Sequence, residues 1–247
     1  MGGAHVRSLT AVTGPARWNR ETLPEGDEKR EAVRDMFDAI APRYDLVNRI
    51  MTFRLDVRWR RRAVRALGLP AGATVLDLAS GTGDLCLDLR RQGLRPISVD
   101  LSFGMLRADR SGAPRVQADV LRLPAAAASV DGVTCGFALR NLVDLRAFFA
   151  ELGRVLRPGG RVALLDVGMP RNRLVRRGHS IYFGAVVPRI GALLSDAAAY
   201  RYLPRSVAYL PSGEAMVAAL VQAGFADARH DLLSGGITQL LTATRDP

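Results

Sequence analysis

One stretch of the sequence constrains the fold more than any other, residues 75–84 (VLDLASGTGD). Its apolar first half has the length of a buried strand, and Gly81 and Gly83 form a tight turn ahead of a helical segment. Glycine adopts positive φ at no steric cost and lets a ligand approach the backbone closely. Open α/β sheets bind ligands at the carboxyl ends of their parallel strands, so the turn predicts a pocket at that edge of a sheet.

Strands and helices alternate around this turn, which predicts an α/β fold with a parallel, doubly wound sheet. Short apolar runs of strand length lie at 73–78, 96–100, 116–119, 130–137 and 161–167. Helical segments lie among them at 84–91, 105–110 and 145–156. Ser212 is the expected N-cap of a helix over 213–223, which Gly224 ends. An antiparallel hairpin of 226–233 and 237–244 should follow it.

We expect a single domain over residues 27–247, preceded by a polar, flexible tail at 1–26. Helices are predicted within 27–68, and the first carries apolar residues at helical spacing up to Pro42. The second covers 57–67, where arginines surround the helix, as on a solvated helix or one that contacts anionic lipid. Residues 171–210 interrupt the alternation and predict a helical insertion that caps the pocket.

The net charge of +11 is carried almost entirely by arginine, because Lys29 is the one lysine of the chain. Such a charge attracts nucleic acid, anionic lipid or acidic substrates without choosing among them. Aromatic residues make up only 6% of the chain and Trp59 is the clearest case of one among basic residues, which disfavours nucleic-acid binding. The chain has two isolated cysteines, no secretory signal and no apolar run of about 18 residues, so we expect a cytoplasmic protein. Its three histidines lack the spacing of metal ligands.

Acidic residues at the ends of three successive predicted strands indicate what the pocket binds. Asp100, 19 residues beyond the first turn glycine, is placed to accept hydrogen bonds from a ribose diol. Asp119 is placed to accept one from an adenine amino group, with Val120 beside the ring. Asp77 and Asp84 flank the turn, where they can meet an ammonium group directly or through water. These groups together match S-adenosylmethionine.

A dinucleotide is the alternative ligand for a Gly-x-Gly turn after a strand. Its fingerprint requires a third small residue where this chain has Cys86. A hydride-transfer enzyme also usually needs a second nucleotide-binding half, and the sequence has no second glycine turn of that kind. The sequence therefore favours S-adenosylmethionine.

Several further segments have the form of family signatures. They are Tyr44-Asp45-x-x-Asn48 with Trp59, Phe137-x-Leu139-Arg140-Asn141, 154–160 (RVLRPGG), 188–191 (PRIG) and 200–203 (YRYL). Through these segments, residues 37–244 resemble the ubiquinone/menaquinone biosynthesis C-methyltransferases. The chain departs from the family pattern at Val47, Thr52, Asp56, Asp166 and Gly168. The resemblance implies methyl transfer to a ring carbon of demethylmenaquinol. The departures keep another quinol, or an aromatic secondary metabolite, open as the acceptor.

The resemblance also implies a site with two sides and no metal. The expected cofactor-binding residues are Asp77, Ala79, Gly81, Thr82, Gly83, Asp100, Leu101, Asp119 and Val120. On the acceptor side, Arg140 is expected to stabilise a ring oxyanion, while Asn141 and Tyr44 orient the ring or a water.

The implied substrate carries a prenyl tail, which needs an apolar groove or a membrane. The apolar stretch 181–194 and the first helix are candidates for that groove, and the arginines at 171, 173, 176 and 177 suit a phospholipid surface. We therefore expect a prenylated quinol as substrate, peripheral contact at the inner face of the cell membrane, a homodimer, and no nucleic-acid partner.

Overall fold

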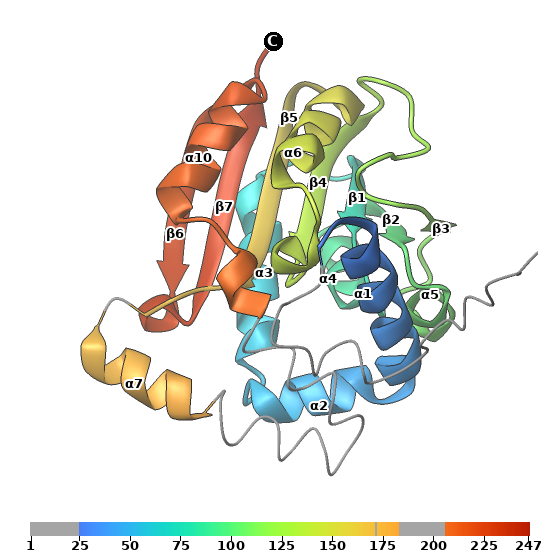
Figure 1. Ribbon diagram of the computed structural model, residues 1–247. Helices are drawn as coiled ribbons and strands as arrows, with labels where there is room; N and C mark the ends of the chain where they lie inside the picture. The colour runs from blue at the N-terminus through green and yellow to red at the C-terminus, as the bar shows by residue number, and fades with distance from the viewer. Residues whose placement is uncertain (1–24, 171, 183–205) are drawn as a thin grey trace, which may run out of the picture.

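The computed structural model describes residues 25–170, 172–182 and 206–247. Its centre is a seven-stranded sheet in the order β3-β2-β1-β4-β5-β7-β6 (Figure 1). The strands are β1 (Thr74–Leu78), β2 (Arg95–Asp100), β3 (Arg115–Gln117), β4 (Val130–Gly136), β5 (Leu156–Val167), β6 (Phe225–Leu233) and β7 (Thr238–Arg245). The first five pair in parallel, and β7 pairs antiparallel with both β5 and β6. The predicted doubly wound sheet with a terminal hairpin is confirmed.

Helices cover both faces of the sheet. They are α1 (Gly26–Ile40), α2 (Tyr44–Met51), α3 (Leu55–Leu67), α4 (Asp84–Arg91), α5 (Phe103–Ala108), α6 (Leu145–Val155), α7 (Arg173–Ile181) and α10 (Gly213–Gln222). Figure 1 shows α6 and α10 in front of the sheet and α3 and α4 behind it. Short 3-10 turns are η2 (Ala41–Arg43), η3 (Leu139–Asn141), η5 (Val207–Tyr209) and η6 (Ser234–Gly236).

The two faces of the sheet follow from the alternation of side chains along its strands. Leu76 and Leu78 point to the face under α6 and α10, where they join a core that includes Phe148 and Phe149. Val75, the residue before Leu76, points to the other face and joins the core under α3 and α4. An apolar run of this kind therefore serves two cores at once, as expected of a strand buried on both faces.

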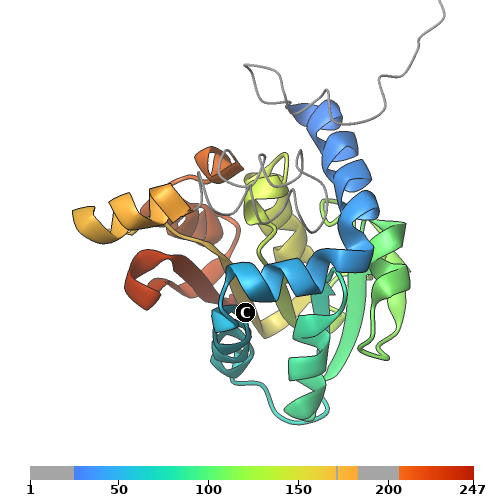
Figure 2. The same cartoon turned by 90° about the horizontal axis from the view of Figure 1, so that it is seen from below.

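The N-terminal helices lie across the carboxyl ends of the parallel strands (Figure 2). They form a third, smaller apolar cluster with one residue of α5. This N-terminal cluster consists of Ala32, Met36, Ile40, Ala41, Val47, Met51 and Met105. Helix α1 was predicted from its apolar period, whereas α2 was not assigned to a helix.

Four details differ from the sequence prediction. Strand β3 ends at Gln117, so Asp119 lies in the loop beyond the strand and not at its end. Strand β5 begins at Leu156, and residues 157–160 form an irregularity between the Val130–Leu156 and Gly132–Arg161 pairs. Helix α5 begins at Phe103 because the hydroxyl of Ser102 accepts a hydrogen bond from the Met105 amide. The basic helix starts at Leu55, two residues earlier than predicted.

The predicted cap and tail are only partly described. Helix α7 and η5 are helical, as expected for 171–210, but 183–205 lie outside the described residues, with the 188–191 and 200–203 motifs. Residues 1–24 also lie outside them. Among the described residues, no helix combines the length and the apolar character of a membrane span.

Candidate active site

The glycine turn lies where the strand order reverses, between β1 and β4. Gly81 and Gly83 have φ of +58° and +84°, in the left-handed region that favours glycine. A Cβ on Gly83 would lie 2.3 Å from the Asp109 carboxylate, whereas a Cβ on Gly81 would meet nothing nearer than the Met105 sulfur at 4.0 Å. Gly83 is thus required by packing, and Gly81 leaves open space beside the backbone.

A cavity of about 790 Å³, partly open to solvent, occupies this edge of the sheet. The segments that follow β1, β2, β3 and β4 line it, together with helix α1. Eight of the predicted site residues lie in its wall: Tyr44, Ala79, Gly81, Asp100, Leu101, Asp119, Val120 and Asn141. The structure therefore brings the expected cofactor side and part of the expected acceptor side into one space.

Asp100 is fixed by the backbone on both sides of it. Its Oδ2 accepts a hydrogen bond from the Gly81 amide at 2.8 Å, and its Oδ1 accepts one from the Ser102 amide at 2.8 Å. Burial raises the pKa of Asp100 to about 6 despite these two bonds. A carboxylate oxygen has two acceptor positions, so each oxygen keeps one for a ligand. A ribose diol fits this arrangement.

Asp119 has two partners at the opposite wall. Its Oδ1 accepts a hydrogen bond from the Leu121 amide at 2.9 Å, and its Oδ2 lies 3.4 Å from the Arg30 guanidinium of α1. Val120, between Asp119 and Leu121 in the chain, is buried. Phe37 and Met105 add apolar surface to the cavity. Apolar side chains beside a carboxylate suit an adenine ring.

Helix α1 contributes cavity residues that the sequence prediction did not include. Arg30, Val33, Arg34 and Phe37 line the cavity along one side of the helix. Met36 and Ile40, on the neighbouring side, are buried in the N-terminal cluster. The sequence could have indicated this role, because the helix has more apolar residues than its packing against the N-terminal cluster requires.

Four predicted residues lie outside the wall of the cavity. Asp77 is fully buried beneath the turn, where it accepts hydrogen bonds from the Thr134 hydroxyl at 2.8 Å and the Cys86 thiol at 3.4 Å. Burial raises the pKa of Asp77 to about 7. The other three are Thr82, Gly83 and Arg140. We therefore expect these four residues to affect binding indirectly, by positioning the residues that line the cavity.

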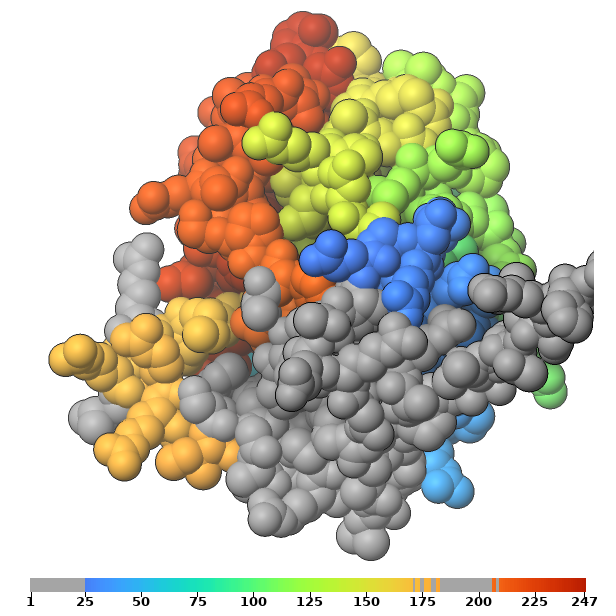
Figure 3. Space-filling view, in the orientation of Figure 1, coloured from blue at the N-terminus to red at the C-terminus, as the bar shows by residue number. Residues whose placement is uncertain are grey.

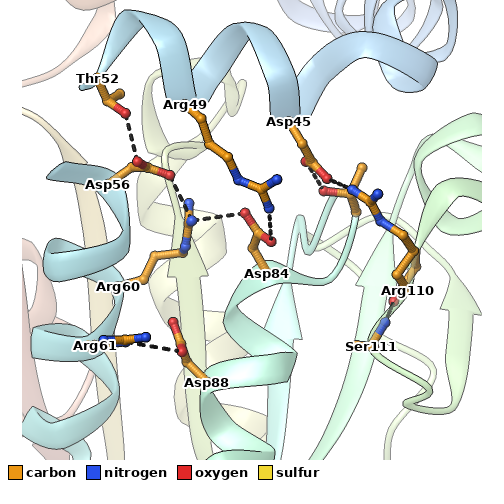
Figure 4. Close-up of polar contacts among 12 residues, drawn as sticks. Asp45, Arg49, Thr52, Asp56, Arg60, Arg61, Asp84, Asp88, Arg110 and Ser111 are labelled. Atoms are coloured by element: carbon orange, nitrogen blue, oxygen red, sulfur yellow. Dashed lines mark hydrogen bonds and ion pairs between the residues drawn. The ribbon is translucent and has the colours of Figure 1, made fainter. Parts of the chain in front are cut away.

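Helix α2 holds the glycine turn at two points (Figure 4). Asp45 accepts a hydrogen bond of 2.5 Å from the Thr82 hydroxyl and pairs with Arg110. One helical turn later, Arg49 lies 3.4 Å from the Asp84 carboxylate. These contacts give the Tyr44-Asp45 signature a structural role, because it connects the N-terminal helices to the turn.

A buried arginine completes this polar network (Figure 4). Arg60 of α3 pairs with Asp56 at 2.7 Å and with Asp84 at 2.9 Å. Neither of the two interpretations of these arginines, a solvated face or a contact with anionic lipid, holds for Arg60, since its partners are the buried Asp56 and the half-buried Asp84. Thr52 donates to Asp56 at 2.7 Å, so two departures from the family pattern contact each other. Neither of the two lines the cavity.

The Arg140 side chain is buried behind η3. Its Nη1 donates to the Phe137 carbonyl at 2.6 Å and pairs with Asp166, and its Nε donates to the Ser206 hydroxyl at 3.2 Å. Asn141 follows in the chain and lines the cavity. Loss of contact with water raises the pKa of Tyr44 to about 12, so its phenol is protonated at neutral pH. Asp166, a departure from the family pattern, was not predicted to be the partner of Arg140.

Solved structures share this architecture. A chain from the complex between the Haloferax volcanii Trm112 methyltransferase activator and the putative methyltransferase aligns with a TM-score of 0.63 at 19% identity, covering 85% of this chain and 98% of that one. Haemonchus contortus phosphoethanolamine N-methyltransferase 2, in complex with S-adenosyl-L-methionine, aligns with a TM-score of 0.57 at 15% identity, covering 78% of this chain and 53% of that one. The sheet order and its terminal hairpin are those of the class I S-adenosylmethionine-dependent methyltransferase fold.

Curated relatives narrow the class further. The Geobacter sulfurreducens ubiquinone/menaquinone biosynthesis C-methyltransferase is 41% identical over 230 residues, covering 88% of this chain and 90% of the relative. The demethylmenaquinone methyltransferase of Roseiflexus sp. (strain RS-1) is 38% identical over 235 residues, covering 90% and 97%. Residues 25–245 match the ubiE/COQ5 methyltransferase family. The chain belongs to this family of S-adenosylmethionine-dependent C-methyltransferases of quinone biosynthesis, as the sequence resemblance predicted.

Proposed function

We propose that the chain transfers a methyl group from S-adenosylmethionine to a ring carbon of demethylmenaquinol, which gives menaquinol. The observation that carries this proposal is one cavity bounded by the glycine turn, by Asp100, and by Tyr44 and Asn141. The Roseiflexus relative named for this reaction supports it. The departures at Thr52 and Asp56 are compatible with it, because they bond to each other away from the cavity.

The cofactor side is proposed to bind through Asp100 at the ribose and through Asp119 and Val120 at the adenine. The open backbone at Gly81 suits the amino-acid end. Bound S-adenosylmethionine supplies a methyl group on a cationic sulfur. Phe37, Met105 and Leu142 give the cavity an apolar wall, which is proposed to keep water from this charge. Such an environment favours a transition state in which the charge is lost.

The acceptor side has to make a ring carbon nucleophilic. Ionisation of a neighbouring ring hydroxyl does this, and hydrogen-bond donors aimed at the resulting oxygen stabilise it. The hydroxyl proton, and after methyl transfer the proton of the methylated ring carbon, are proposed to leave to water at the open side of the cavity. The Asn141 amide and the protonated Tyr44 phenol are the proposed donors at the cavity. Asp166 offsets the charge of Arg140, so we expect Arg140 to orient the η3 segment and to polarise it, and not to accept a proton.

The test is incubation with labelled S-adenosylmethionine and a panel of quinols and aromatic phenols, followed by mass spectrometry to locate the label. The proposal expects label on the ring carbon of demethylmenaquinol. Label on a ubiquinol precursor, or on a phenol without a prenyl tail, would select the alternative acceptor. Arg140→Lys should lower turnover about tenfold or more, since lysine cannot reproduce the fork that contacts Asp166 and Ser206. Unchanged turnover would remove Arg140 from the mechanism.

We also propose that α2 contacts the membrane in which a prenylated substrate resides. Leu46, Ile50 and Phe53 are 56%, 41% and 74% exposed, and the exposed Arg43 and Arg54 flank them. Apolar side chains among basic ones are typical of an interfacial helix. Replacing the three apolar residues by serine should reduce sedimentation with anionic liposomes, while Phe103→Ser on α5 should not. Equal sedimentation of both variants would refute the contact. The homodimer and the cytoplasmic location stay predictions.

A further inference from the structure

The single lysine of the chain is buried. The chain has 35 Lys and Arg residues, and all of them except Lys29 are arginine. Lys29, near the start of α1, is only 3% exposed. Burial lowers the pKa of Lys29 to about 8, with Glu25 acting in the opposite direction. A buried ammonium group is costly unless it is hydrogen-bonded, so its partners indicate what it does.

The ammonium group of Lys29 joins three segments that are far apart in the sequence. Its Nζ donates to the Arg140 carbonyl at 3.1 Å and to the Leu142 carbonyl at 2.8 Å. It also lies 3.5 Å from the centroid of the Tyr209 ring in η5. Figure 3 shows the surface of α1 (blue) beside that of the segment leading into α6 (yellow-green) and that of the chain before α10 (orange).

Lysine and arginine differ in what they can satisfy at such a position. An ammonium group is compact and directs its three donors by rotation, which suits two nearby carbonyls and an aromatic face. A guanidinium is planar and holds its donors in a fixed fork, which suits a carboxylate. In a chain that otherwise uses arginine, a lysine at this point fits the shape of the site.

We propose that Lys29 is a positioning residue that fixes the η3 segment, and with it Arg140 and Asn141, against helix α1. This inference rests on the acceptor-side roles proposed above for those two residues. Lys29 acts through their backbone, because its contacts are with carbonyl groups on either side of Asn141. The glycine turn is held separately by α2, so loss of Lys29 should loosen the acceptor wall and leave the turn in place.

The variants Lys29→Met and Lys29→Arg test the inference, with Arg107→Met on α5 as the matched control. Arg107 is exposed and does not line the cavity. Both Lys29 variants should lower kcat about 100-fold, the effect of misplacing a reacting group by roughly 1 Å. Their affinity for S-adenosylhomocysteine should stay within about threefold of the wild type, since Asp100 and the turn are unchanged. The control should match the wild type in both measurements.

Hydrogen exchange supplies a readout that needs no reaction. In Lys29→Met, amides of residues 139–142 should exchange about tenfold faster, while those of 79–84 keep their rate. Unchanged exchange at 139–142, full kcat in Lys29→Arg, or a parallel loss of cofactor affinity and kcat would each overturn the inference. If the wild type methylates no quinol, the proposed function fails, whereas the exchange result still decides the role of Lys29.

Discussion

Two glycines of the same turn should respond differently to alanine, one mainly in stability and the other mainly in cofactor binding. Gly83→Ala places a methyl group 2.3 Å from Asp109 Oδ1 and 2.9 Å from the Ser111 Cβ, at a φ of +84°. Asp109 cannot move aside easily, because it accepts hydrogen bonds from the Ser111 amide at 2.6 Å and the Ser98 hydroxyl at 2.5 Å. The left-handed backbone costs roughly 1–2 kcal/mol. Overpacking adds about 1–3 kcal/mol.

The free energy of unfolding should therefore fall by about 2–5 kcal/mol in Gly83→Ala. Gly81→Ala should lose only the backbone part, about 1–2 kcal/mol, because the nearest atom to the new methyl group is the Met105 sulfur at 4.0 Å, an ordinary contact without overlap. That methyl group enters the cavity instead, and should weaken the binding of S-adenosylhomocysteine about tenfold, or 1.4 kcal/mol.

Urea denaturation without ligand measures the first effect, and titration calorimetry with S-adenosylhomocysteine measures the second. The slope of the denaturation should stay the same in both variants, so that the midpoints report stability. Equal destabilisation of the two variants, or normal cofactor affinity in Gly81→Ala, would refute the reasoning.

Three further perturbations have expected outcomes. Asp100→Ala removes a charged acceptor and should weaken S-adenosylhomocysteine binding by about 1.5–3 kcal/mol, and calorimetry showing wild-type affinity would exclude the ribose contact. Asp45→Ala deprives Thr82 of its acceptor and should lower the free energy of unfolding by about 2 kcal/mol, which an unchanged urea midpoint would contradict. The pKa of Asp77 is raised from 3.8 to about 7 by burial, so the folded state binds more protons than the unfolded state across that interval. The stability from this group is complete below pH 4 and is lost as the pH rises to 7, by at most about 4 kcal/mol, so Asp77→Asn should flatten the measured dependence, and an unaltered slope would argue against a shifted Asp77.

The sequence predicted the sheet well because its strands carry both signals that a parallel sheet requires. Runs such as 73–78 and 161–167 are mostly apolar and short, which is typical of strands buried on both faces of a parallel sheet. The position of Asp100 at the cavity was also predicted, because Asp100 ends a parallel strand and the carboxyl ends of parallel strands lie at one edge of the sheet. Strand β3 was overextended, since three residues give too short a pattern to locate its end.

The polar contacts could not be predicted, because the charge of a side chain does not show which residue it will pair with in the fold. Arg60 looks like its exposed neighbours in sequence, and only the docking of α3 against α4 buries it between Asp56 and Asp84. The Lys29 contacts with carbonyl groups leave no trace in side-chain patterns, since every residue has a carbonyl. Gly168 became explicable only with the fold, where a Cβ would lie 2.5 Å from the Gly236 carbonyl.

The N-terminal cluster determines when the cavity is completed. Six of its seven buried residues precede β1 in the chain, and the seventh, Met105, follows β2. As the chain leaves the ribosome, α1 and α2 therefore emerge before the surface on which they pack exists. We expect the two helices to dock once the sheet has formed, because their contacts with Met105 and the strand ends are of long sequence separation and form slowly. The wall that these helices give to the cavity should then assemble late, and in the folded protein it should open early.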